Sequence, residues 1–356
     1  MEHRYFAASN SAEGFKNYYA EVFSRADFIY IIKGGPGTGK SSLMKRVARR
    51  AEEKGAECEY YFCSSDPSSL DGVLIFGERR GTVGILDGTA PHVSEPKFPG
   101  AHEQIINLGE CWDVDLLRKQ KNEIVALSER KSAEYRNAYT YLRSVGNLRA
   151  VSKGFLSDTL NYAKLRAFIS RLVKDLPLGT IAYKPAILDS VSMGGRVRFD
   201  SFEKNAKKLY IINDFHGAGK MFLTELFLLL QGRGVSARIS FDPVCPSSVD
   251  GIFLEDENVA FVVRSDGNEK YESREYVSDC REVLFINSKR FVDAEKLREV
   301  RSELRYTDRM AECSLDGALH ALSKAKIYHF LLEDIYGKAM DWSKFEKMSA
   351  ELCERI

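Results

Sequence analysis

Residues 27–41 read DFIYIIKGGPGTGKS, an apolar run followed at once by a glycine-rich loop. Residues 27–32 are apolar, β-branched and aromatic, which is typical of a buried strand. Residues 34–41 fit the pattern G-x-x-x-x-G-K-[ST], and residues 41–54 carry apolar side chains at helical spacing. A strand, a glycine-rich loop and a helix in this order predict an α/β fold, with a mostly parallel sheet and helices on both faces.

The residue types of this loop suit the binding of a phosphate chain. Glycines let backbone N–H groups surround phosphate oxygens, and the helix that follows directs its positive end at the anion. The lysine of the pattern supplies a charge to the β- and γ-phosphates, and the hydroxyl after it ligates Mg²⁺. We therefore expect a P-loop NTPase fold with ATP and Mg²⁺ as ligands. The expected nucleotide-binding residues are Gly34, Gly35, Pro36, Gly37, Thr38, Gly39, Lys40, Ser41 and Ser42.

A second motif supplies the carboxylate that such a site needs. Residues 82–87, TVGILD, read as an apolar strand that ends in an acid. A carboxylate at the end of a neighbouring strand holds Mg²⁺ through water. The predicted metal ligands are therefore Ser41 and Asp87, and Lys40 and Asp87 are predicted catalytic residues.

The identity of the catalytic base stays open in the sequence. Gly88 follows Asp87, at a place where many fast ATPases have a glutamate that orients water. Asp66, Asp71 and His92 lie on loops after predicted strands and could take this role, and Asp66 and His92 complete our predicted catalytic set. Each could equally be a turn residue that bonds its own backbone. Weaker candidates for contacts to the γ-phosphate are Arg79, Arg80 and Asn107.

The sequence contains an internal repeat with an offset of 179 or 180 residues. PSSLDG at 67–72 returns as PSSVDG at 246–251, and GTGK at 37–40 returns as GAGK at 217–220. Shorter matches pair Asp87-Gly88 with Asp266-Gly267, Ile106-Asn107 with Ile286-Asn287, and Asp113 with Asp293. The repeat predicts two similar lobes, residues 1–180 and 181–356.

Each predicted lobe ends in a charged, helix-periodic segment. Residues 114–176 form the first, with one expected break near Gly146-Asn147, and residues 294–356 form the second. We expect two or more helices packed beside each α/β core, and these segments are candidate surfaces for a protein partner.

The second glycine loop has lost two groups that nucleotide chemistry needs. Asp214 replaces the first glycine, and Met221 replaces the hydroxyl that would ligate Mg²⁺. An acid repels a triphosphate, and a thioether is a poor ligand for a hard cation. We predict that lobe two does not hydrolyse nucleotide.

Composition excludes several other classes of protein. Lys plus Arg is 52 and Asp plus Glu is 51, so no charge excess indicates a nucleic acid as partner. The seven cysteines are scattered and form no CxxC pair, which favours a reducing compartment. The first residues lack the apolar core of a signal peptide, and no apolar stretch is long enough to span a bilayer. We expect a cytoplasmic protein without a membrane partner.

Several stretches together resemble a known family. They are residues 3–7 (HRYFA), 33–41 (KGGPGTGKS), 63–66 (CSSD), 70–73 (LDGV), 87–92 (DGTAPH) and 107–110 (NLGE). The chain resembles, over essentially its whole length, a family from spore-forming Firmicutes with tandem P-loop lobes, described as predicted ATPases or ATP-binding proteins of unknown function. In that family the second loop often keeps a fuller Gly-Lys-Ser/Thr form, from which this chain departs at Asp214 and Met221. The resemblance implies the architecture and ATP binding, and it brings no established substrate.

Three functions agree with these observations. The first is a Mg²⁺-dependent ATPase that uses the N-terminal lobe. The second is a kinase of a small molecule or nucleotide, which the absence of a glutamate after Asp87 favours. The third is a non-catalytic, nucleotide-dependent switch or scaffold. A GTPase is disfavoured because the sequence has no Asn-Lys-x-Asp motif.

Overall fold

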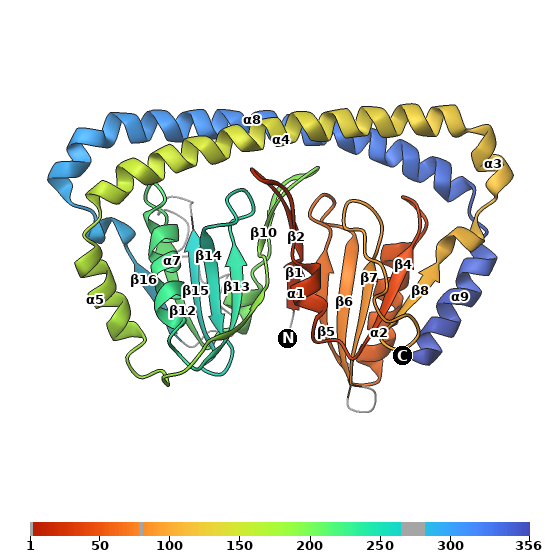
Figure 1. Ribbon diagram of the computed structural model, residues 1–356, viewed down its shortest axis with the longest axis horizontal. Coiled ribbons are helices and arrows are strands. Elements are labelled where there is room, and N and C mark those ends of the chain that lie inside the picture. Colours follow the sequence, from red (N-terminus) through yellow and green to blue (C-terminus); the bar gives the residue numbers. More distant parts are fainter. Residues whose placement is uncertain (1–2, 78–80, 265–281) are drawn as a thin grey trace.

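The computed structural model describes residues 3–77, 81–264 and 282–356, which form two lobes beneath a pair of long helices (Figure 1). Each lobe contains one six-stranded sheet. The expected turn at Arg79 and Arg80 and the expected match at Asp266-Gly267 lie outside the described residues.

The sheet of lobe one has the strand order β1-β5-β6-β7-β4-β8. Strand β6 is antiparallel to both of its neighbours, and the other neighbouring pairs are parallel. The strands are β1 (His3–Phe6), β4 (Phe28–Lys33), β5 (Glu57–Phe62), β6 (Leu70–Gly77), β7 (Gly81–Asp87) and β8 (Glu103–Asn107).

The sheet of lobe two repeats this arrangement in the order β9-β13-β14-β15-β12-β16, with β14 as its antiparallel strand. Its strands are β9 (Ala182–Pro185), β12 (Lys208–Asn213), β13 (Ser236–Phe241), β14 (Val249–Leu254), β15 (Val259–Arg264) and β16 (Glu282–Ile286). Each lobe also has a small hairpin, formed by β2 (Ala8–Ser11) with β3 (Gly14–Asn17) and by β10 (Asp189–Ser192) with β11 (Gly195–Arg198). The prediction of an α/β fold with mostly parallel sheets in two lobes is thus confirmed.

Buried side chains of the first sheet alternate between its two faces, and helices cover both faces. Tyr30 and Ile32 of β4 pack with α2 (Lys40–Glu53), whereas Ile29 and Ile31 pack toward α1 (Tyr19–Phe23). In lobe two, α7 (Ala218–Leu230) and α6 (Ser201–Asn205) take the equivalent places. The inner faces of the two sheets share one apolar core, which joins the lobes.

The long helices pack against each other across both lobes (Figure 1). They are α4 (Lys121–Thr159) and α8 (Ala294–Lys338), and α3 (Val114–Lys119) precedes α4. The expected break near Gly146 is wrong, since α4 continues through it. A Cβ at Gly146 would lie 2.5 Å from the Cβ of Ala12, so this glycine serves a close approach between α4 and lobe one.

The last helix of each half packs on the opposite lobe. Helix α5 (Tyr162–Leu172) places Leu165 in the core of lobe two, and α9 (Trp342–Arg355) places Phe345 in the core of lobe one. The short helices η1 (Leu108–Cys111) and η3 (Ser288–Phe291) bond the chain just before α9 and α5, respectively. The N–H of Asp341 donates to the carbonyl of Cys111 at 2.7 Å, and the N–H of Asn161 donates to Phe291 at 2.9 Å. The division of the chain between residues 180 and 181 stays a prediction. The packing shows in addition that each half places its last helix on the other lobe.

Candidate functional site

The glycine-rich loop connects β4 to α2 at the carboxyl end of the first sheet. Gly37 and Gly39 have φ of 68° and 86°, in the left-handed region that favours glycine. The hydroxyl of Thr38 donates to the carbonyl of Gly35 at 2.8 Å and braces the turn. Helix α2 begins at Lys40, so its unsatisfied N–H groups face the loop. This is the backbone form that a phosphate chain requires.

Lys40 and Asp87, which the sequence paired by motif, lie together in the structure. The ammonium of Lys40 is 3.6 Å from the carboxylate Oδ2 of Asp87. It also donates to the carbonyls of Gly34 and Gly35, at 3.2 and 2.6 Å. Asp87 is buried, and its Oδ1 accepts from the N–H and hydroxyl of Thr89. Phosphate oxygens could replace these loop carbonyls as hydrogen-bond acceptors of Lys40.

The hydroxyl of Ser41 faces the start of β6. It accepts from the N–H of Leu70 at 2.9 Å, one residue before Asp71. Ser42 is exposed on α2. Ser41 is thus positioned between the loop and the strand that carries Asp71.

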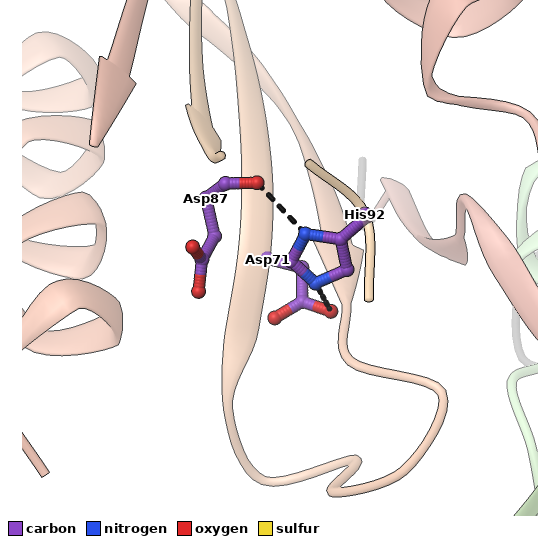
Figure 2. Close-up of side chains that lie close together, drawn as sticks. All are labelled: Asp71, Asp87 and His92. Atoms are coloured by element: carbon purple, nitrogen blue, oxygen red, sulfur yellow. Dashed lines mark hydrogen bonds and ion pairs between the residues drawn. The ribbon is translucent and has the colours of Figure 1, made fainter. Parts of the chain in front are cut away.

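His92 connects Asp71 and Asp87, as Figure 2 shows. Its Nδ1 lies 2.9 Å from the backbone carbonyl of Asp87, and its Nε2 lies 3.2 Å from Oδ2 of Asp71. A carbonyl and a carboxylate are both acceptors, so the two contacts favour the ring form with a proton on each nitrogen. Burial opposes the charge of that form, but the hydrogen bond and the negative charge of Asp71 outweigh it and raise the pKa of His92. In this form His92 would link the side chain of Asp71 to the backbone of Asp87.

The three side chains also meet the geometric requirement for a cation site. Asp71, Asp87 and His92 each offer a ligand atom, and these atoms lie within 4.8 Å of one another. His92 would have to lose a proton and turn from its partners to ligate a metal. The oxygen ligands that Mg²⁺ prefers are those of Asp87, Asp71 and Ser41.

A buried tyrosine completes the surroundings of this group. The ring of Tyr19 lies 5.1 Å from that of His92, centroid to centroid. Its hydroxyl is buried beside Asp71, and burial, followed by the carboxylate of Asp71, raises the pKa of Tyr19 well above its ordinary value.

The other sequence candidates have structural roles or lie outside the described part. Asp66 accepts from the N–H and hydroxyl of Ser68 and from the hydroxyl of Ser69. Burial opposes ionisation, but these hydrogen bonds lower the pKa of Asp66, which makes it a weak base. Asn107 accepts from the N–H of Gly109 at 3.0 Å and caps η1.

Helices from the far end of the chain cover the glycine-rich loop, which the sequence did not predict. A Cβ on Gly35 would lie 2.9 Å from the ring of Tyr336, and one on Gly39 would lie 2.8 Å from the ring of Phe345. A Cβ on Gly37 would overlap the carbonyl oxygen of Glu333. The three glycines therefore allow α8 and α9 to contact the loop directly.

The equivalent site in lobe two is filled by its own carboxylates. The ammonium of Lys220 is bonded to Asp242 and lies 3.8 Å from Asp214. Asp214 also accepts from the N–H of Gly219 at 3.0 Å, where a phosphate oxygen would bind. The side chain of Met221 is buried in an apolar cluster. The loop lysine of lobe two thus has carboxylate partners within the chain, and the absence of nucleotide hydrolysis in lobe two stays a prediction.

Lobe two also has no acid at the position of Asp87. Asp87 pairs with Ile32 across β7 and β4, and Val263 pairs with Ile212 in the same way across β15 and β12. Val263 therefore stands at the register position of Asp87, with an offset of 176 residues in this strand, and Asp266 lies outside the described residues.

In the described part of the chain, no helix is long and apolar enough to cross a membrane.

One family model, described as Nephrocystin 3, N-terminal, matches residues 15–73. The matched stretch contains β4, the glycine-rich loop, α2 and β5, and it covers less than half of the chain. No curated protein and no solved structure matches the chain.

Proposed function

We propose that lobe one binds ATP with Mg²⁺ and hydrolyses it. The observation that carries this proposal is the position of Lys40, in a glycine loop at the start of α2 and 3.6 Å from the acid that ends β7. Backbone N–H groups of residues 34–41 would bind the β-phosphate, and Lys40 would bind oxygens of the β- and γ-phosphates. The resemblance to the tandem-lobe ATPase family agrees with this assignment.

Ser41 and Asp87 would hold Mg²⁺, which neutralises charge on the phosphates when bound. The ligand atoms of Asp71, Asp87 and His92, which lie within 4.8 Å of one another, support a cation at this place. Asp71 is the carboxylate best suited to orient the attacking water. It is buried, and His92 holds one of its oxygens in a fixed direction.

A phosphate-release assay with ATP and Mg²⁺ tests the proposal. We expect turnover by the wild-type chain, and loss of turnover in EDTA and in Asp87→Asn. Asp66→Asn serves as the matched control, because Asp66 bonds its own loop, and it should keep most of the activity. The proposal fails if the wild type releases no phosphate, or if Asp87→Asn is as active as the wild type.

A nucleotide-dependent switch is the second candidate, and the cover over the loop favours it. Tyr336, Glu333 and Phe345 contact three loop glycines, and they belong to α8 and α9, which follow the second sheet in the chain. Phosphates that enter the loop would act on these helices directly. ATP binding without turnover, accompanied by a change in hydrogen exchange of α8, would favour this function over hydrolysis.

A further inference from the structure

Lys131 lies on the side of α4 that faces lobe one. Leu127, one turn before it, packs with Leu332 and Ile335 of α8. Tyr139, two turns after it, donates its hydroxyl to Oδ1 of Asn10 in β2 at 2.9 Å. Residues spaced by four lie along one stripe of a helix, so Lys131 lies between these two contacts on one side of α4.

Lys131 is half-buried, and the charges that act on it are those of Lys40 and Glu333. Burial, and then repulsion from Lys40, lower the pKa of Lys131, with Glu333 opposing them. Among the described residues, no hydrogen bond or ion pair joins Lys131 to a carboxylate, and Glu333 instead pairs with His329 at 3.5 Å. Two ammonium groups thus share one side of the phosphate loop without a bridging anion.

In lobe two, a buried carboxylate supplies the anion for the loop lysine. Asp242 bonds the loop lysine, Lys220, and its Oδ1 lies 3.3 Å from Arg149, whose counterpart in the repeat is His329 of α8. The sheet register puts Cys63 at the position of Asp242, since Phe62 pairs with Leu70 as Phe241 pairs with Val249. Lobe one therefore lacks the internal carboxylate that joins loop and helix in lobe two.

We propose that Lys131 contacts the terminal phosphate of the bound nucleoside triphosphate, and so supplies a second cation from α4. This inference rests on the proposed nucleotide site. The loop encloses the β-phosphate, and the loop lysine spans the β- and γ-phosphates, so a cation from the opposite wall meets the terminal group. A half-buried ammonium binds a phosphate oxygen more strongly than an exposed one.

Binding of Mg-ATP and Mg-ADP to four proteins, measured by titration calorimetry, tests the proposal. They are the wild type, Lys131→Met, Lys131→Arg and Lys153→Met, the last removing an exposed lysine from the same helix. A charged hydrogen bond is worth about 1.5–3 kcal/mol, so Lys131→Met should weaken ATP binding by about tenfold or more. ADP binding should change little, Lys131→Arg should keep most of the ATP affinity, and Lys153→Met should match the wild type.

Equal loss of ATP and ADP affinity in Lys131→Met would overturn the proposal, as would no loss of either. If the wild type binds neither nucleotide, the proposed function itself has failed.

A labelling experiment on the wild type avoids any folding defect of the variants. ATP, but not ADP, should protect Lys131 from an amine-acylating reagent, as measured by mass spectrometry. Equal labelling with both nucleotides would contradict the contact.

Discussion

The ammonium of Lys220 is bonded to the carboxylate of Asp242, which is buried in lobe two. Lys40 and Cys63 occupy the equivalent positions in lobe one, where no such carboxylate stands. Lys220 thus has a hydrogen-bonded carboxylate partner, whereas Lys40 lies 3.6 Å from the carboxylate of Asp87 and donates to two carbonyls of its own loop.

Lys220→Ala should destabilise the protein and leave ATP turnover unchanged. The change removes one partner from buried Asp242, and Arg149 remains, so the free energy of unfolding should fall by about 1–3 kcal/mol. Urea unfolding and phosphate release measure the two effects. A large loss of turnover in a folded Lys220→Ala protein would mean that lobe two takes part in the chemistry.

His92 should stay protonated at a pH where an ordinary histidine is neutral. Asp71 raises its pKa despite burial, so its NMR titration should have a midpoint above the ordinary value of about 6.5. Because the folded pKa exceeds the unfolded one, the ion pair stabilises fully below about pH 6.5, and this stability is lost as pH rises through the folded pKa. Asp71→Asn should lower the midpoint and flatten the pH dependence of unfolding. A midpoint at or below the ordinary value would contradict the imidazolium assignment.

Phe345→Ala and Leu165→Ala form a matched pair, because the two residues stand at equivalent positions of the exchanged helices α9 and α5. Both side chains are buried, so each truncation should cost about 2–5 kcal/mol of unfolding free energy. Phe345 also lies against Gly39 of the phosphate loop. Phe345→Ala alone should therefore weaken Mg-ATP binding, measured by calorimetry on the folded fraction. Equal effects of both variants on nucleotide affinity would argue against direct control of the loop by α9.

Gly37→Ala and Gly217→Ala separate backbone strain from the contact with α8. Both glycines have positive φ, at 68° and 97°, so each alanine should cost about 1–2 kcal/mol in strain. The added Cβ meets the carbonyl of Glu333 at Gly37, and it meets nothing within 4 Å at Gly217. Gly37→Ala should be the more destabilising and should raise hydrogen exchange near the end of α8. Similar stabilities and exchange rates would show that α8 does not depend on this contact.

Local patterns predicted the core of the candidate site. The strand before the loop, the helix after it and the acid at the end of β7 follow from apolar periodicity and from residues that only a phosphate site needs together. The repeat likewise predicted that a second sheet would follow the first. Those features depend on short stretches of sequence, so Lys40 and Asp87 could be predicted from the sequence.

The remaining features depend on contacts between distant segments. The apolar stripe of residues 342–356 indicates burial, but it does not say which lobe covers it, so the exchange of α5 and α9 could not be read from it. Glycine weakens helices, so the sequence predicts a break near Gly146, whereas its close approach to Ala12 gives it a packing role. The bond from Asp242 to Lys220 joins residues whose meeting depends on the sheet register, which no local pattern fixes.

Binding of Mg-ATP to the wild type, Lys40→Ala and Lys220→Ala, measured by calorimetry under one set of conditions, tests the central claim most directly. The two lysines stand at equivalent positions of the repeat, so they control for each other. We predict that the wild type and Lys220→Ala bind one equivalent of ATP with similar affinity, and that Lys40→Ala loses this binding. Intact binding by folded Lys40→Ala would contradict the account.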